Sequence, residues 1–136
     1  MSGPGVDTNV LLRFLLQDDE SQAGMAEARI GVQGLAGEPV VICLLTLLEA
    51  EWVLRTRGRL DKPGMITLFE RLLDARDIVI EAEDVLEQAV HDYRNASADF
   101  ADCLINARYR SLGCPSMLTF DAKAAILPGA ELLAAG

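Results

Sequence analysis

The feature that most constrains the fold is the alternation of very short β-type runs with longer helical patterns. Val40–Cys43 and Ile78–Ile80 are rich in valine and isoleucine, as buried strands are, and Ser116–Phe120 follows a Gly-Cys-Pro break. Strands of three to five residues separated by helices favour a parallel sheet that is covered on both faces. The sequence therefore predicts an α/β fold, with a short start at Gly5–Val6 and a last short strand at Glu131–Ala134.

Helical patterns fill the segments between these runs. Leu44–Arg57 is apolar on nearly every face, which predicts a buried helix rather than an amphipathic one, and Gly58 is a suitable stop. Asp84 and Glu87 have the spacing of a capping box and open a helix that runs to about residue 95. Further helices are expected over Glu20–Leu35, Lys62–Ala75 and Asp99–Leu112, and a turn is expected at Pro128-Gly129.

Length and composition suit a single domain. The 136 residues are 51% hydrophobic, enough for one sizeable core, and we expect one domain over residues 1–136. No apolar run approaches the roughly 20 residues that span a bilayer. The N-terminus lacks the basic and apolar regions of a secretory signal. We therefore expect a cytoplasmic protein without membrane contact.

The net charge of −9, with a pI near 4.5, argues against broad, charge-driven binding of nucleic acid. Nucleic acid held at a small basic rim or through a metal ion is compatible with this charge, and so is a positively charged protein partner. Arg13, Arg55, Arg57 and Arg59 are candidate phosphate contacts, with solvated surface charge as the competing interpretation.

Cysteine and histidine offer no evident metal site. Cys43, Cys103 and Cys114 are odd in number and form no CxxC pair, which argues against a disulfide framework or a zinc site. We expect them to be small buried apolar residues. The single histidine, His91, lies in a helical pattern beside Asp92, so we expect it at the surface and expect no histidine-based catalysis.

Acidic residues at the ends of apolar runs, or inside them, are the most informative polar feature. A carboxylate in such a place must be paired, protonated or bound to a cation. Asp7 and Asp121 each follow a predicted strand, and Asp99 and Asp102 share one turn at the start of a helix. Helix capping is a competing interpretation for three of them, Asp7, Asp99 and Asp121. Asp102 is harder to explain by capping, because an apolar run follows it directly.

Glu49 lies within the apolar helix expected at Leu44–Arg57. Glu49 and Glu51 are two residues apart and therefore point to nearly opposite sides of a helix. At most one of them faces solvent comfortably, and the sequence does not decide which. A structural ion pair with an arginine is the competing interpretation for Glu49.

Together, these acids predict a metal site at one edge of the sheet. In parallel sheets function collects at the carboxyl ends of the strands, where Asp7 and Asp121 are expected to lie. Oxygen-rich sites without cysteine or histidine favour Mg²⁺ or Mn²⁺. Such ions activate water and stabilise in-line displacement at phosphorus, and they draw a phosphate into an acidic cleft.

Four sequence blocks carry these acids in order: Val6–Arg13, Leu47–Glu49 with Glu51–Arg55, Asp99–Ile105 and Leu118–Asp121. The ordered set covers essentially the whole chain and resembles the PIN-domain nucleases, most of all the VapC-type toxins of bacterial toxin–antitoxin pairs. The resemblance implies a three-layer α/β/α sandwich with a short, mostly parallel central sheet. It also implies Mg²⁺- or Mn²⁺-dependent endoribonuclease activity on RNA, homodimers, and a cognate antitoxin protein as partner.

The resemblance also assigns roles to the five acids. Asp7, Asp102 and Asp121 would hold the metal, with Asp7 and Asp102 as the principal ligands. Glu49 would complete the acidic pocket, and Asp99 is an additional acid that part of the family has. All five are therefore expected to serve catalysis.

Two further positions and one departure follow from the same comparison. Asn9 and Thr119 correspond to the polar residues that orient the carboxylates. The Ser2–Gly5 segment departs from the usual apolar first strand, because a proline and two glycines make a poor strand.

Other functions compete with this interpretation. A haloacid-dehalogenase-like phosphatase needs a second aspartate two residues after the first, and here that place is Asn9, which cannot act as a general acid. A stand-alone RNA-processing nuclease of the same fold, and a module that binds RNA or protein without cutting, both stay open.

Overall fold

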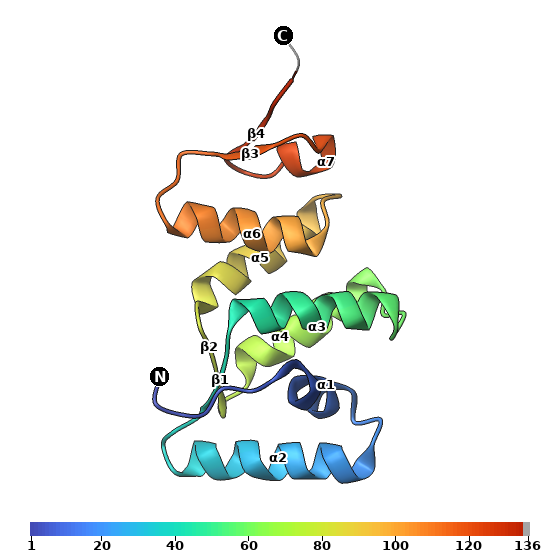
Figure 1. The fold of residues 1–136 in the computed structure, drawn as a ribbon, viewed down its shortest axis with the longest axis vertical. Helices are drawn as coiled ribbons and strands as arrows, with labels where there is room; N and C mark the ends of the chain where they lie inside the picture. The colour runs from blue at the N-terminus through green and yellow to red at the C-terminus, as the bar shows by residue number, and fades with distance from the viewer. Residues whose placement is uncertain (135–136) are drawn as a thin grey trace. The chain divides into compact units, whose positions relative to one another are not determined.

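The computed structural model describes residues 1–134 and divides into two compact units, Met1–Glu83 and Asp84–Gly136. Each unit combines helices with one pair of short parallel strands (Figure 1). The mixed α/β class predicted from the sequence is therefore confirmed. None of the helices within residues 1–134 has the length and apolar content that crossing a membrane requires.

The first unit contains a small parallel sheet. Strand β1 (Val40–Ile42) pairs with β2 (Ile78–Ile80), and Val40 lies opposite Ile78. Both strands fall inside the β-branched runs that predicted them, and in each the first and last residues are buried while the middle one is half-buried. Branched side chains at every position suit a strand that is covered on both faces.

The segment before the first helix lies beside β1 without forming a full strand. It is joined to the sheet by one parallel bridge between Gly5 and Val41, and the Val6 amide donates to the Val41 carbonyl at 3.1 Å. A Cβ atom at Gly3 would collide with the carbonyl oxygen of Pro39. The glycine therefore permits a close backbone approach, although it weakens the strand.

Four helices belong to the first unit. Figure 1 shows the first helix packed on the second, and the side chains buried between the elements of this unit are mainly leucine, with Met65 and Phe69. Asp61 caps the fourth helix by accepting from the Gly64 amide at 2.9 Å. The helices are α1 (Thr8–Leu16), α2 (Glu20–Leu35), α3 (Leu44–Thr56) and α4 (Lys62–Asp74).

The expectation that α3 is buried on nearly every side is wrong. Leu47 and Leu54 are fully buried, but Leu45 is 75% exposed and Trp52 is 50% exposed. These two residues lie seven apart, so they share one face of the helix. Hydrophobic periodicity identifies the exposed face of a helix by its polar residues. The exposed face of α3 carries large apolar side chains, so the pattern gave no sign of it.

The second unit packs two long helices and a short strand–helix–strand segment. Asn106, fully buried on α6, donates to the Pro128 carbonyl at 2.8 Å and so fixes the predicted Pro128-Gly129 turn. Met117 lies opposite Ala130 in the parallel strand pair. The elements are α5 (Glu83–Asn95), α6 (Phe100–Ser111), β3 (Met117–Thr119), α7 (Ala122–Ala125) and β4 (Ala130–Leu132).

Candidate functional site

Asp7 connects the bridged N-terminal segment to α1. It occupies the N-cap position in extended backbone, and its carbonyl accepts from the Leu11 amide at 3.1 Å. Its side chain makes no capping hydrogen bond and is exposed. Asp7 therefore occupies a helix-capping position, but its carboxylate does not take part in capping the helix.

The structure separates the two glutamates of α3. Glu51 is the interior one, only 2% exposed, and its carboxylate accepts from the Arg55 guanidinium at 2.9 Å. Glu49 is exposed on the other side of the helix. The structural ion pair that competed for Glu49 therefore belongs to Glu51, and Glu49 is left facing solvent.

Glu81 is an acid at the carboxyl end of β2 that the sequence interpretation passed over. Its carboxylate accepts from the Leu44 amide in the first turn of α3 at 2.9 Å, and its own amide donates to the Ile42 carbonyl at 2.9 Å. It therefore caps α3 from a distant part of the chain and fixes that helix to the strand ends. The available sequence signal was an acid directly after a buried strand, the same signal that drew attention to Asp7.

The three cysteines differ in environment. Cys103 is fully buried, as expected, whereas Cys43 and Cys114 are only partly buried. Cys43 occupies the N-cap position of α3, and its Sγ lies 3.2 Å from the Thr46 hydroxyl. The hydrogen bond from the Thr46 side chain, helped by the Thr46 amide, lowers the pKa of the Cys43 thiol.

Cys43 is therefore expected to be alkylated first of the three cysteines. A lowered pKa enlarges the thiolate fraction at neutral pH, and the thiolate is the nucleophile. Mass spectrometry after limited iodoacetamide treatment measures the order. Thr46→Val protein should react more slowly at Cys43 at neutral pH. Equal rates in the two proteins would contradict the assigned role of Thr46.

Asp99 and Asp102 lie at the start of α6. Asp99 is the N-cap residue, yet its exposed side chain makes no capping hydrogen bond. Asp102 is half-buried in the first turn, next to the buried residues Cys103 and Leu104. Desolvation raises the pKa of the Asp102 carboxyl, and the negative charges of Asp121 and Asp99 raise it further.

Asp121 is the N-cap of α7, a four-residue helix that was not among the predicted elements. Its carboxylate accepts from the Lys123 amide at 2.9 Å, so the capping interpretation holds for this residue. The Thr119 hydroxyl accepts from the Asp121 amide at 3.0 Å. Thr119 thus holds the backbone of Asp121 at the end of β3.

The candidate acids divide between the units. Asp7 and Glu49 belong to the first unit, and Asp99, Asp102 and Asp121 belong to the second. Carboxylates alone suit a hard divalent cation, and a cation would relieve the repulsion that raises the pKa of Asp102. The donor set therefore fits Mg²⁺ or Mn²⁺. Within the described part of either unit, no three acidic, cysteine or histidine side chains already form a metal-binding group.

One acid is buried without belonging to this set. Asp92 on α5 is 5% exposed and accepts from the Gln88 amide group at 3.0 Å, while its Oδ2 atom has no hydrogen-bond partner. The neighbouring His91 is exposed, as predicted. Asp92 lies in an ordinary amphipathic pattern, which gave no signal of its burial.

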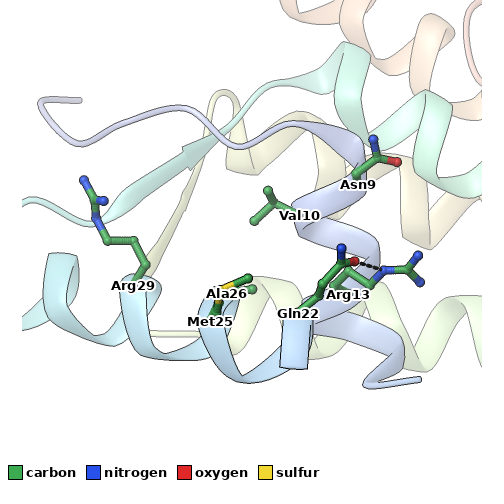
Figure 2. Close-up of a pocket in the computed structure, with 7 residues that line it drawn as sticks. All are labelled: Asn9, Val10, Arg13, Gln22, Met25, Ala26 and Arg29. Atoms are coloured by element: carbon green, nitrogen blue, oxygen red, sulfur yellow. Dashed lines mark hydrogen bonds between the residues drawn. The ribbon is translucent and has the colours of Figure 1, made fainter. Parts of the chain in front are cut away.

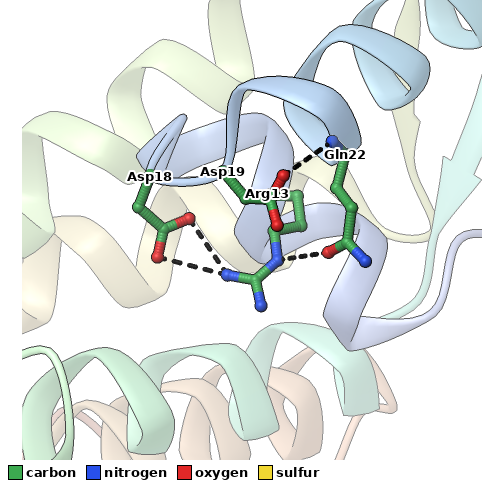
Figure 3. A network of polar contacts seen from close by, with 4 residues as sticks. All are labelled: Arg13, Asp18, Asp19 and Gln22. Carbon is green, nitrogen blue, oxygen red and sulfur yellow. Dashed lines mark hydrogen bonds and ion pairs between the residues drawn. The ribbon is translucent and has the colours of Figure 1, made fainter.

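Arg13 is engaged in a local network rather than free for a phosphate. Figure 3 shows its guanidinium between Asp18 and Gln22, with bonds of 3.0 and 3.1 Å to the Asp18 carboxylate and 2.7 Å to the Gln22 side chain. Asp19 caps α2 beside it by accepting from the Gln22 amide at 3.0 Å. The network joins the end of α1 to the start of α2.

A pocket of about 340 Å³ lies between α1 and α2, and its lining contains none of the candidate acids (Figure 2). Its lining includes the apolar side chains of Val10, Met25 and Ala26, with Arg29 at one side. Asn9, expected to orient a carboxylate, lines this pocket as well. Asp7, two residues before Asn9, is the candidate acid nearest to this lining in the sequence.

Comparison with known protein families gives a match over most of the chain. The family model of the PIN domain matches residues 6–129, a span that includes all five candidate acids and reaches into both units. A search of curated proteins returned no match, and a search of solved structures returned none either.

Proposed function

Because the chain belongs to the PIN domain family, whose members are in general metal-dependent nucleases, we propose that it is a Mg²⁺-dependent endoribonuclease that hydrolyses RNA phosphodiester bonds. Mn²⁺ is the alternative ion. The family match extends across both compact units, which supports treating residues 1–136 as one nuclease domain. The proposed place of action is the cytoplasm.

One observation carries the proposal. Asp102 is a half-buried carboxylate whose charge is opposed by two neighbouring acids, Asp99 and Asp121. Such crowding is unfavourable in a protein without a counter-ion and becomes favourable when a divalent cation binds. Asp7 adds support, because its carboxylate lies at a helix start without capping that helix.

The residues receive the following proposed roles. Asp7, Asp102 and Asp121 would hold the metal, which supplies charge stabilisation and activated water for displacement at phosphorus. Glu49 would complete the acidic pocket or position the attacking water, and Asp99 would add negative charge beside Asp102. Two polar residues would orient the acids: Thr119, which already bonds the Asp121 amide, and Asn9.

Cleavage of RNA oligonucleotides tests the proposal. We expect cleavage with Mg²⁺, none with EDTA, and a loss of more than about 100-fold in Asp7→Asn protein, because replacing a metal ligand costs at least as much as replacing a group that supports one. Asp74→Asn, which changes an exposed aspartate at the end of α4, is the matched control and should cut like the parent. Equal cleavage by the Asp7→Asn protein and the parent would reject the site.

We further propose that the protein is the toxin of a toxin–antitoxin pair and works as a homodimer. This predicts a small adjoining gene whose product, when co-expressed, binds the chain and suppresses RNA cleavage. Absence of such a gene would favour a stand-alone RNA-processing nuclease. Cleavage that persists in the purified complex would contradict the inhibitory partnership.

A further inference from the structure

The exposed face of α3 carries an aromatic side chain next to a proposed catalytic acid. Trp52, the single tryptophan of the chain, is 50% exposed and lies three residues after Glu49. Residues three apart are neighbours on a helix surface. Leu45, four residues before Glu49, is 75% exposed on the same face. Leu45, Glu49 and Trp52 therefore form one exposed stripe, here called the α3 stripe.

A guanidinium group stands over the tryptophan. The Arg57 guanidinium carbon lies 6.0 Å from the centroid of the Trp52 ring, within the range of a cation–π contact. In the part of the chain that the structure describes, no carboxylate forms an ion pair with Arg57 or Arg59. Arg55 differs from them, because it is paired with Glu51.

The charge around this end of α3 is opposite to that of the chain. Residues 55–62 contain three arginines and one lysine but a single acid, Asp61, within a chain of net charge −9. The Asp61 carboxylate is occupied in capping α4. The end of α3 therefore offers positive charge that is only partly neutralised by neighbouring residues.

We infer that Trp52 and Arg57 form a stacking platform for an unpaired base of single-stranded RNA, with Arg59 as a contact for the adjacent phosphate. Aromatic rings with arginine beside them hold single-stranded nucleic acid by stacking and charge together. The inference rests on the proposed nuclease function, and it adds a binding site that the five acids do not provide. The platform would hold the strand about one helical turn from Glu49.

A second copy of the chain is a less suitable occupant of this face. A two-fold contact centred on the α3 stripe would bring Glu49 towards its own copy. Like charges that face each other oppose association. RNA instead brings phosphates to the arginines and flat bases to the ring.

Binding is tested in EDTA, so that cleavage plays no part. Because Trp52 is the single tryptophan, its fluorescence reports on this site alone, and short unstructured RNA should quench it. Anisotropy of a fluorescein-labelled strand gives the affinity. Trp52→Leu should weaken single-strand binding by about 10-fold, and Trp52→Phe should retain most of it. Binding of a duplex of the same sequence should change little, because its bases are already stacked.

Matched controls separate the platform from general effects. Tyr109→Leu removes an exposed aromatic from α6, and Arg76→Gln removes an exposed cation from the loop before β2. Both should bind single-stranded RNA like the parent, whereas Arg57→Gln should bind more weakly than Arg76→Gln. Melting temperatures near that of the parent establish that each variant is folded.

The outcomes distinguish this inference from the proposed function. Normal binding together with absent cleavage would reject the nuclease but keep the platform. Unchanged affinity in Trp52→Leu protein, with cleavage intact, would reject the platform alone. If Trp52→Leu converts a dimer to a monomer in sedimentation without altering RNA affinity per chain, the face is a contact between copies and the inference is overturned.

Discussion

Asp102→Asn protein is expected to melt at a higher temperature than the parent in EDTA and at a lower temperature than the parent in saturating Mg²⁺. The pKa of Asp102 is raised in the fold by desolvation and by the charges of Asp121 and Asp99. The folded state therefore favours the protonated carboxyl. That stabilising contribution is fully present below the ordinary pKa of 3.8 and is lost as the pH rises through the raised value.

At neutral pH the parent therefore bears the repulsion, and the neutral asparagine does not. The gain is expected to be small, because Asp102 is only half-buried and water screens its charge. The difference between the two proteins in EDTA should shrink as the pH falls through the raised pKa of Asp102, where the parent becomes protonated as well.

Magnesium should reverse the order. An ion present at 100 times its dissociation constant stabilises the folded state by about 2.7 kcal/mol, which corresponds to roughly 10 °C for a chain of this size. Asp102→Asn should lose most of this gain, along with RNA cleavage. Differential scanning calorimetry in EDTA and in Mg²⁺, across pH, measures all of these effects. A variant less stable than the parent in EDTA at neutral pH would contradict the account of Asp102.

The strands and long helices could be predicted because their local patterns were unambiguous. The β-branched runs that contain β1 and β2 have few alternatives, and Asp61 and Asp19 cap helices as aspartate commonly does. Helix α7 was missed because four residues are too few to show a helical period. The bond from the Ala125 amide to the Asp121 carbonyl, 3.0 Å long, is the helical contact that distinguishes it from a turn.

The candidate site could be predicted in its residues but not in its contacts. The rule that acids at strand ends carry function identified Asp7 and Asp121, and it would have identified Glu81 if applied at β2. The bond from the Leu44 amide to Glu81 joins residues 37 apart, and no local pattern contains it. Asp7 occupies an N-cap position, as capping would require, but its side chain makes no capping hydrogen bond. The presence of aspartate at an N-cap does not by itself determine whether the carboxylate turns back to the first amides of the helix.

The two glutamates of α3 are expected to respond differently to substitution. Glu49→Gln is expected to lower RNA cleavage by roughly 10- to 100-fold with little change in stability, because the residue is exposed and proposed to act on the metal or water. Glu51→Ala is expected to lower stability and to leave the cleavage rate of the folded protein nearly unchanged. It removes a buried carboxylate and its bond to Arg55, which should cost about 1–3 kcal/mol of unfolding free energy.

The pair is informative because the two changes share one helix, one residue type and nearly one position. Urea unfolding gives the stability of each protein, and cleavage rates corrected for the folded fraction give the activity. Arg55 is half-exposed, so its guanidinium has access to solvent when the carboxylate of Glu51 is removed. If the corrected rate instead falls with Glu51→Ala and stays normal with Glu49→Gln, the buried glutamate is the functional one and the role proposed for Glu49 is wrong.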